Sequence, residues 1–437
     1  MAQRLRGARN QTPPERVFRF NFILFIMNGA FGGLGDALTS TPLVMTAFLS
    51  QLTTSNTLIA MLGPLRDAGW YLPQFFMTSW VDRARRKVTA YRASTIFRMA
   101  AWLALVVCIF TIQDRVILLI AVFACTIAIS FLAGFAALPF LILTAKVIPA
   151  DRRGLVFGLR QFIGGALGVA AGGLVALILG GQFGLQYPQN YALVLGGGAT
   201  GYALSYIVLG FTREEPDEAP ARTSPIRVNL KLAWSIARSD AQYQRYIVMR
   251  VALLAASACV PFLTVYAKRA LGVNDGFIGT LISVTLACSL LSNMVWARLS
   301  DRSGNRLVMI IAAVMGLIFC AVAAIITGLT PDASNSDLAH LALIGLFGFS
   351  GVLQTGINLA SLPLMIEVAP VNNQSLYIGL SNTILGVMIL LTSSVGIIVD
   401  QLGFTGLFIF SGLAFVVALE RLARMNEPRV SAVREVA

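Results

Sequence analysis

The sequence predicts an all-α, polytopic membrane protein with twelve transmembrane helices in two pseudo-symmetric six-helix bundles. Three observations predict it: the composition, the number of long apolar stretches and a similarity between the two halves. The chain is 57% hydrophobic and 12% charged, whereas a soluble domain is about half apolar and a quarter charged. Inside a bilayer only helices and closed barrels pair every backbone group, and these stretches exceed the roughly ten alternating residues of a barrel strand.

Twelve stretches are long enough to span a bilayer, since a spanning helix needs about 20 mostly apolar residues. Because the number of spans is even, both termini are expected on the same side. The expected spans cover residues 20–49, 56–79, 92–112, 116–144, 154–180, 190–211, 244–267, 276–297, 307–328, 339–366, 375–399 and 404–420.

The basic residues orient these spans. A net charge of +13 would suggest nucleic acid in a soluble protein, but Lys and Arg also collect on the cytoplasmic side of membrane proteins. With cytoplasmic termini, 27 of the 33 Lys and Arg lie on the inner side, including all six at 83–98, and the outer loops hold only Arg115, Lys268 and Arg269. We therefore expect a multi-pass protein of the cytoplasmic (inner) membrane, surrounded by lipid and without a nucleic-acid partner.

A polar segment near the middle of the chain divides it. Residues 212–243 begin acidic and proline-rich and continue as an amphipathic segment from Ile226 to Arg238. This segment either lies on the inner leaflet or serves only as a tether. We expect an N-terminal six-helix bundle at 1–211, a cytoplasmic linker at 212–243 and a C-terminal six-helix bundle at 244–437.

The two halves repeat two landmarks outside the apolar spans. The loop sequence TSWVDRARRK contains Asp82 and Arg83, and ARLSDRSGNR contains Asp301 and Arg302, at a shift of 219 residues. After spans four and ten, KVIPADRRGLVFGL aligns with EVAPVNNQSLYIGL at a shift of 221 residues. Chance similarity of apolar segments does not explain loop prolines and acids in register, so the halves are expected to be parallel repeats.

At these loops the chain resembles the major facilitator superfamily, which carries a G-x-x-x-D-R-x-G-R-R-type motif between spans two and three and a weaker copy between eight and nine. The second copy matches better here, because Thr78 and Arg85 replace the motif glycines in the first. The resemblance implies that the protein transports a small-molecule substrate. We expect the protein to be a monomer. The resemblance also implies that the loop residues are conformational latches; simple anchoring on the inner side is the alternative. The latch candidates are Asp82, Arg83, Asp301, Arg302, Gly304 and Arg306.

Three ionisable residues fall near the middle of the first two spans: Asp36, Arg66 and Asp67. A charge at membrane depth costs at least about 2.5–3.5 kcal/mol, so it needs a partner or a function. Arg66 is the expected ion-pair partner of Asp36, which leaves Asp67 over. A carboxylate in a partly dry cavity can carry a proton, so Asp36 and Asp67 are the candidates for proton coupling. A static buried salt bridge is the alternative.

Seven polar side chains are candidates to line a substrate cavity. Those near the cytoplasmic ends of spans five and seven either snorkel to the interface or face the cavity, where an arginine would suit an anionic substrate group. Those in spans ten and eleven either line the cavity or bond neighbouring helices. The candidates are Asn28, Arg160, Gln161, Arg250, Gln354, Asn358 and Asn382.

Span five also carries glycines at a spacing that allows close helix packing, in the stretch GGALGVAAGG from Gly164 to Gly173. Exporters of the resembled family have a similar stretch with proline where Val169 stands here. Together these observations favour a proton-coupled secondary transporter, with export slightly preferred as an antiporter. A uniporter or nutrient symporter, and a lipid-handling or sensor protein on the same fold, are the alternatives.

Enzymatic chemistry is not expected. The chain has one histidine and no H-E-x-x-H sequence, and its five cysteines lie in apolar runs without a C-x-x-C pair, so neither a metal site nor a cofactor is predicted. It also lacks the G-x-x-x-x-G-K-[ST] sequence of nucleotide-driven pumps.

Overall fold

The structure is a computed structural model that describes residues 15–216, 235, 238–329, 337–370 and 374–426. Residues 71–72, 74–83, 150–151, 374–376 and 378–379 are described as backbone only. Much of the expected linker at 212–243, including the segment from Ile226 to Arg238 apart from residues 235 and 238, lies outside this description.

The described chain is helical along nearly its whole length. The helices are α2 (Glu15–Leu38), η1 (Thr41–Met45), α3 (Thr46–Leu52), α4 (Asn56–Arg83), α5 (Lys87–Thr111), α6 (Arg115–Val147), α7 (Ala150–Leu179), α8 (Gln189–Gly210), α10 (Ala241–Ser257), α11 (Val260–Arg269), α12 (Asp275–Ser303), α13 (Asn305–Leu329), α14 (Asp337–Val368), α15 (Gln374–Leu391), η3 (Thr392–Ser394) and α16 (Val395–Ala423).

Ten helical segments within the described residues are long and apolar enough to cross a membrane. One of them, Leu380–Ala423, contains both of the last two expected spans. Gly403 has non-helical backbone angles there (φ 70°, ψ −175°), which matches the expected boundary between these spans. Helix α4 is not among the ten, because it carries several polar residues. The polytopic helical fold is confirmed, and the number twelve stays a prediction.

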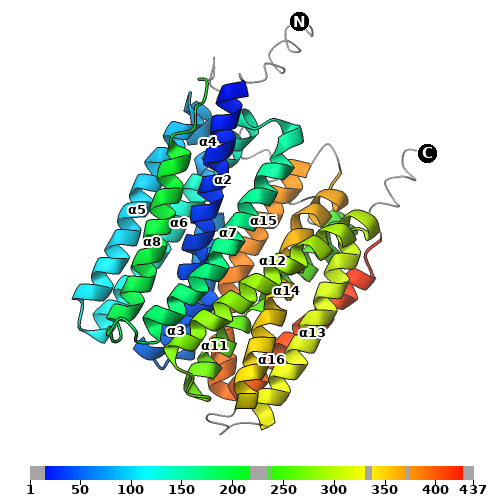
Figure 1. Cartoon of the computed structure of the whole chain (residues 1–437). Helices are drawn as coiled ribbons and strands as arrows, with labels where there is room; N and C mark the ends of the chain where they lie inside the picture. The colour runs from blue at the N-terminus through cyan, green and yellow to red at the C-terminus, as the bar shows by residue number, and fades with distance from the viewer. Residues whose placement is uncertain (1–14, 217–234, 236–237, 330–336, 371–373, 427–437) are drawn as a thin grey trace, which may run out of the picture.

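The two halves repeat the same pattern of helix packing (Figure 1). In the N-terminal bundle, α2 packs on α7 and α8, α4 on α6, and α5 on α6 and α8. In the C-terminal bundle, α10 packs on α15 and α16, α12 on α14, and α13 on α14 and α16. Between the bundles, α7 packs on α12, and α4 on α15. Each of these contacts has its counterpart in the other half, so the predicted pseudo-symmetry is confirmed.

The start of α2 and the end of α16 lie toward the same end of the molecule (Figure 1), which we call the terminal end. The opposite end, which holds α3 and the start of α12, is the distal end.

A proline breaks the first span of each bundle. Pro42 stands at the start of η1 and Pro261 at the start of α11, 219 residues apart, as the repeated loops are. Proline has no N–H to continue the helical ladder. The expected span 20–49 therefore becomes α2, η1 and α3, and the expected span 244–267 becomes α10 and α11. The broken regions meet between the bundles, where the Thr264 hydroxyl donates to the Pro42 carbonyl oxygen at 2.7 Å.

Side-chain caps mark where several helices begin. The Asp114 carboxylate accepts hydrogen bonds from two backbone N–H groups at the start of α6, each at 2.9 Å. Asp240 caps α10 in the same way, at 2.9 and 3.0 Å, and Asn274 caps α12. Because the first N–H groups of a helix have no partner within it, such caps fix the helix start.

The glycines of α7 bring three helices together. A side-chain carbon at Gly33 of α2 would lie 2.5 Å from the backbone of Gly164. One at Gly172 would lie 2.7 Å from both the Gly279 carbonyl oxygen and the Ser283 nitrogen of α12. Only a residue without a side chain permits these distances, so the glycine face of α7 joins the N-terminal bundle to the C-terminal one.

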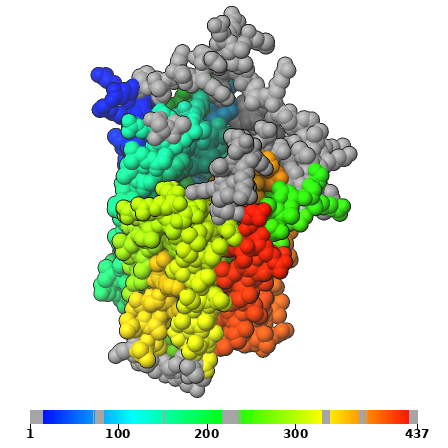
Figure 2. Space-filling view, turned by 90° about the vertical axis from the view of Figure 1, so that its right-hand side faces the viewer, coloured from blue at the N-terminus to red at the C-terminus, as the bar shows by residue number. Residues whose placement is uncertain are grey.

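Large apolar side chains cover the outer surface of the bundles. Leu103 of α5 is 64% exposed, Leu291 of α12 74% and Leu413 of α16 62%. Figure 2 shows α13 (yellow) beside α16 (red) on one such face. An apolar outer surface of this extent is what contact with lipid tails requires.

We expect Gly172→Ala to destabilise the protein by about 1–3 kcal/mol, as overpacking does, because the added methyl group meets the backbone of α12. The control is Gly173→Ala, where a methyl group meets nothing within 4 Å and alanine favours the helix by up to about 1 kcal/mol. Thermal unfolding of the two purified variants measures the difference. Equal melting temperatures would contradict the close packing of α7 on α12.

Candidate functional site

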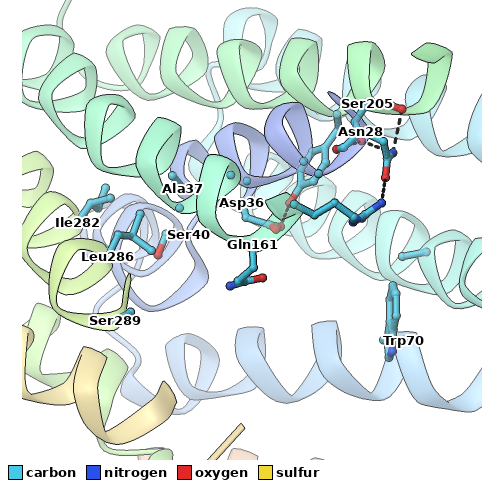
Figure 3. A pocket seen from close by; sticks show the side chains of 18 of the residues that line it. Asn28, Asp36, Ala37, Ser40, Trp70, Gln161, Ser205, Ile282, Leu286 and Ser289 are labelled. Carbon is cyan, nitrogen blue, oxygen red and sulfur yellow. Dashed lines mark hydrogen bonds between the residues drawn. The ribbon is translucent and has the colours of Figure 1, made fainter. Parts of the chain in front are cut away.

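A cavity of about 580 Å³ lies between the two bundles. It is within the roughly 300–1,000 Å³ range of small-molecule sites. Helices α2, α4, α5, α6, α7 and α8 line it on one side, and α11, α12 and α14 on the other. The N-terminal bundle supplies all its charged groups, while the C-terminal bundle supplies apolar and small polar side chains, among them Leu286 and Ser289 (Figure 3).

Asn28 joins three helices at one end of this cavity. Its amide nitrogen donates to the Ser205 hydroxyl at 2.6 Å and to the Ser205 carbonyl oxygen at 2.9 Å. Its amide oxygen accepts from the Arg160 guanidinium at 2.7 Å (Figure 3). Arg160 also donates to the Phe25 carbonyl oxygen and lies over the Phe140 ring, 4.9 Å from its centroid. Two residues predicted to line a cavity, Asn28 and Arg160, are thus bonded to each other in its wall.

Asp36 faces the cavity from α2. It is an exposed residue, and one carboxylate oxygen accepts from the Tyr202 hydroxyl of α8 at 2.5 Å (Figure 3). The Tyr202 hydroxyl also lies 3.3 Å from the Thr39 hydroxyl. The carboxylate therefore has one protein donor and an open side toward the cavity.

The expected salt bridge between Asp36 and Arg66 is not formed in the described structure. Arg66 instead donates to the Thr39 carbonyl oxygen at 3.2 Å and to the Thr41 hydroxyl. The reason lies in the break after α2: where the helix ends, carbonyl groups lose their helical partners and become acceptors for a nearby guanidinium. Pro42 is the residue from which this break, and with it these acceptors, could have been predicted.

Asp67 lies in a different place from Asp36. It lines a second cavity of about 140 Å³, together with residues of α10, α11 and α15 such as Ser257 and Ile389. The two carboxylates predicted as a group are therefore divided between two cavities.

Of the remaining cavity candidates, some line the central cavity and others do not. Gln161 and Gln354 line the central cavity, and Gln354 donates to the Ser257 hydroxyl at 3.0 Å. Arg250, Asn358 and Asn382 do not line it. Asn358 is exposed on α14. A step of four residues is slightly more than one helical turn of 3.6 residues, so Asn358 is rotated around the helix axis relative to Gln354. With the local packing, this rotation turns the Asn358 side chain away from the cavity.

Sequence reasoning missed Arg98. The distribution of basic residues places Arg98 on the inner side of the membrane, but it lies in the fourth turn of α5 and lines the cavity. Its guanidinium carbon lies 5.3 Å from the Tyr202 ring centroid and 5.1 Å from that of Tyr206. One feature of the sequence could have suggested a partner for Arg98 inside the bundle. Tyr202 and Tyr206 of α8 are four residues apart, so their rings share one face of the helix.

The second loop motif binds helices within the C-terminal bundle. Gly304 ends α12 with φ 87°, a conformation that favours glycine. Asn305 donates to the Glu367 carboxylate of α14 at 2.8 Å. Arg306 donates to carbonyl oxygens at the end of α16, at 2.9 and 3.2 Å.

The other latch candidates lie at the ends of α4 and α12. Asp301 and Arg302 are exposed. The side chains of Asp82 and Arg83, at the end of α4, lie outside the part described. The latch role of all six stays a prediction.

At the distal end, polar side chains do join the bundles. Gln51 donates to both carboxylate oxygens of Asp275, at 3.0 and 2.8 Å. Asn56 donates to Asp400 at 2.8 Å and accepts from Arg269 at 2.9 Å. We call these five residues the distal seal.

Arg269 makes the most contacts in the distal seal. Besides Asn56, its guanidinium donates to the carbonyl oxygens of Thr53, at 2.7 Å, and Thr54, at 3.3 Å. These groups lie at the end of α3, where a cation is favoured by the helix dipole. A single side chain of the C-terminal bundle thus holds the end of one helix of the N-terminal bundle.

Comparison with known proteins agrees with this architecture. The family model described as Major Facilitator Superfamily matches residues 245–435. The C-terminal bundle belongs to that superfamily, and the whole chain has its fold. Among curated proteins, no sequence matches the chain.

Solved major facilitator structures superpose on nearly the whole chain. A bacterial homologue of the iron transporter ferroportin, in an inward-facing state, has a TM-score of 0.68 at 14% identity, over 94% of this chain and 99% of its own. The D-xylose–proton symporter has a TM-score of 0.69 at 12% identity, over 94% and 99%. The nucleoside transporter NupG, as a D323A mutant, has a TM-score of 0.69 at 13% identity, over 92% and 100%. Identities this low establish the fold alone.

We expect Asn28→Ala to destabilise the protein by about 1–3 kcal/mol, since it leaves buried polar groups of α7 and α8 without a partner. Asn358→Ala is the matched control: it removes the same side chain from an exposed position, where changes stay within about 0.5 kcal/mol. Thermal unfolding of both variants measures the effect. A stable Asn28→Ala protein would contradict the bonded cavity wall.

Proposed function

We propose that this protein is a secondary active transporter that moves a small solute across the cytoplasmic membrane by alternating access, coupled to protons through Asp36. The observation that carries the proposal is a cavity with three charged side chains in its wall, Asp36, Arg98 and Arg160, between two pseudo-symmetric bundles that are joined by the distal seal. A solute site that is closed at one end, between two bodies able to rock, is what alternating access requires.

The contacts between the bundles support rocking about α7 and α12. Several hydrogen bonds join described residues of the two bundles. In the N-terminal bundle they involve residues 42–57 and 169. In the C-terminal bundle they involve residues 264–283 and 400. All of these lie at the distal end or beside the glycine face of α7. To expose the cavity at the distal end, the protein would have to break the distal seal and form new contacts elsewhere; the loop motifs are the proposed partners in that state.

Asp36 suits the coupling role better than Asp67. It lines the same cavity as the proposed solute, so protonation there acts directly on the solute site. Asp67 lines the smaller cavity beside α10, α11 and α15. The Asp36 carboxylate has one hydrogen-bond donor and one side open to the cavity. It can therefore gain and lose a proton without disrupting the residues around it.

We further propose that the terminal end faces the cytoplasm and that net transport is export by proton antiport. The basic residues near the terminal end support the orientation. The glycine-rich face of α7, which resembles that of exporters, supports the direction.

We expect Arg269→Gln to shift the protein toward a form open at the distal end. Hydrogen bonds to charged groups contribute about 1.5–3 kcal/mol, so the ratio of open to closed forms should rise about tenfold or more. Spin labels at Thr54→Cys and Leu402→Cys, in a variant without the five native cysteines, measure the distance between the bundles by pulsed electron paramagnetic resonance.

Arg245→Gln is the control for that measurement, because the Arg245 guanidinium donates to the Arg424 carbonyl oxygen within the C-terminal bundle. The distance distribution should not change in this variant. If Arg269→Gln and Arg245→Gln gave the same distribution, the distal seal would not control access.

We expect Asp36→Asn to abolish solute accumulation driven by a pH gradient in proteoliposomes, because an amide cannot carry the proton. Exchange of solute across the membrane without a gradient should continue. Asp67→Asn is the control and should keep the gradient-driven step. Gradient-driven accumulation by Asp36→Asn would contradict proton coupling at this residue.

The alternatives predict other outcomes. A uniporter would show flux that a pH gradient does not drive even in the unmodified protein. A nutrient symporter would take up its solute in the direction of proton entry, whereas an antiporter would export it. A lipid-handling or sensor protein on the same fold would bind a ligand and show no solute flux.

A further inference from the structure

Arg98 differs from the other arginine of the central cavity in that no hydrogen-bond acceptor of the described chain binds its guanidinium. Arg160 donates to Asn28 and to a backbone carbonyl. Within the described residues, no hydrogen bond or ion pair satisfies the Arg98 guanidinium, whose Nε is buried without a partner. Its contacts are with two aromatic faces, Tyr202 and Tyr206.

The groups around Arg98 are also donors. The Tyr206 hydroxyl and the Trp102 indole nitrogen are both buried without a hydrogen-bond partner. An indole N–H can only donate, and a guanidinium has no acceptor at all. The Tyr206 hydroxyl also accepts, and the Trp102 N–H is within hydrogen-bonding reach of it. The Arg98 Nε is a buried donor for which the described chain supplies no acceptor, and such a donor is costly.

The nearby acid does not fill that need. Asp36 lines the same cavity, but the oxygen with a described partner is bonded to Tyr202, and no salt bridge to Arg98 exists among the described residues. Asp36 is the one carboxylate among the cavity-lining residues, against the two guanidinium groups of Arg98 and Arg160. The cavity thus has an excess of one positive charge when Asp36 is ionised and of two when it is protonated.

The rest of the lining suits a flat apolar body. Trp70 of α4 is 40% exposed and lines the cavity, and Figure 3 shows it beside the open space that Asp36 and Gln161 also face. Opposite, α12 contributes Ile282 and Leu286. Aromatic faces and branched aliphatic side chains favour stacking and burial of a ring.

We propose that the cavity binds a small organic anion, a carboxylate on an aromatic or similarly flat apolar body, with the carboxylate on Arg98. This assignment rests on the proposed transport function for its purpose, but the site itself is tested by binding alone. An arginine presents paired N–H groups that match a carboxylate in geometry and charge. Protonation of Asp36 would increase the attraction for the anion, so an anionic solute would be carried together with the proton. For such a solute the coupling is symport, in place of the antiport proposed above.

The test measures the binding of three ligands with one ring system to the purified full-length protein by isothermal titration calorimetry. 2-Naphthoate carries a negative charge, 2-naphthamide is neutral, and 2-naphthylmethylamine carries a positive charge. We expect naphthoate to bind at least tenfold more tightly than the amide, a difference of about 1.4 kcal/mol, and the amine to bind most weakly.

Variants assign the preference to the residue. Arg98→Gln should remove the preference for naphthoate, and Arg98→Lys should keep part of it, because the charge remains while the paired geometry is lost. Arg250→Gln is the matched control: Arg250 is a half-buried arginine of α10 whose Nε also lacks a partner, but it does not line the cavity. It should leave the preference unchanged.

Each other outcome contradicts the proposal. Tighter binding of the amine, an anion preference that survives Arg98→Gln, or no binding of any of the three at millimolar concentration would overturn it. Failure of the transport function looks different: naphthoate would bind through Arg98 and show no flux in proteoliposomes. Conversely, flux of a solute without any preference for anions would leave transport standing and refute this site.

Discussion

The cost of holding a charge inside a membrane organises this structure. An ionisable side chain at membrane depth costs at least about 2.5–3.5 kcal/mol unless it finds a partner or water. Arg66 finds carbonyl and hydroxyl oxygens where α2 is broken, and Arg160 finds Asn28. Asp36 and Arg98 instead face the cavity. Arg98, which no acceptor of the described chain binds, and Asp36, which has one donor, therefore both line the central space.

Glycine and proline make that space possible. The glycine face of α7 lets α2 and α12 approach closely, so two bundles can share one interface near their middle. Pro42 and Pro261 end the first helix of each bundle early and free backbone acceptors at that depth. Without the break after α2, Arg66 would lack its present acceptors and would need Asp36, which would then be closed to the cavity.

The sequence predicted the fold well because the determinants are local and strong. Long apolar stretches must be helices in a bilayer, and the loop motifs around Asp82 and Asp301 revealed the duplication that the matching helix contacts confirm. The site was harder to predict, because it depends on how each helix is rotated. Asn28, Arg160, Gln161 and Gln354 line the cavity as predicted, while Asn358 and Asn382 do not, and spacing in one chain cannot distinguish these cases. Arg98 was missed because the same residue type also marks cytoplasmic loops.

The central claim is that water and solute reach this cavity from one side of the membrane at a time. The most direct measurement places one cysteine at Gln161, in a variant without the native cysteines, and follows its reaction with a membrane-impermeant thiol reagent in oriented vesicles. We predict reaction from the cytoplasmic side in the unmodified background, and added reaction from the opposite side when Arg269→Gln weakens the distal seal. A cysteine that reacts from neither side, or only from the same side in both backgrounds, would contradict alternating access.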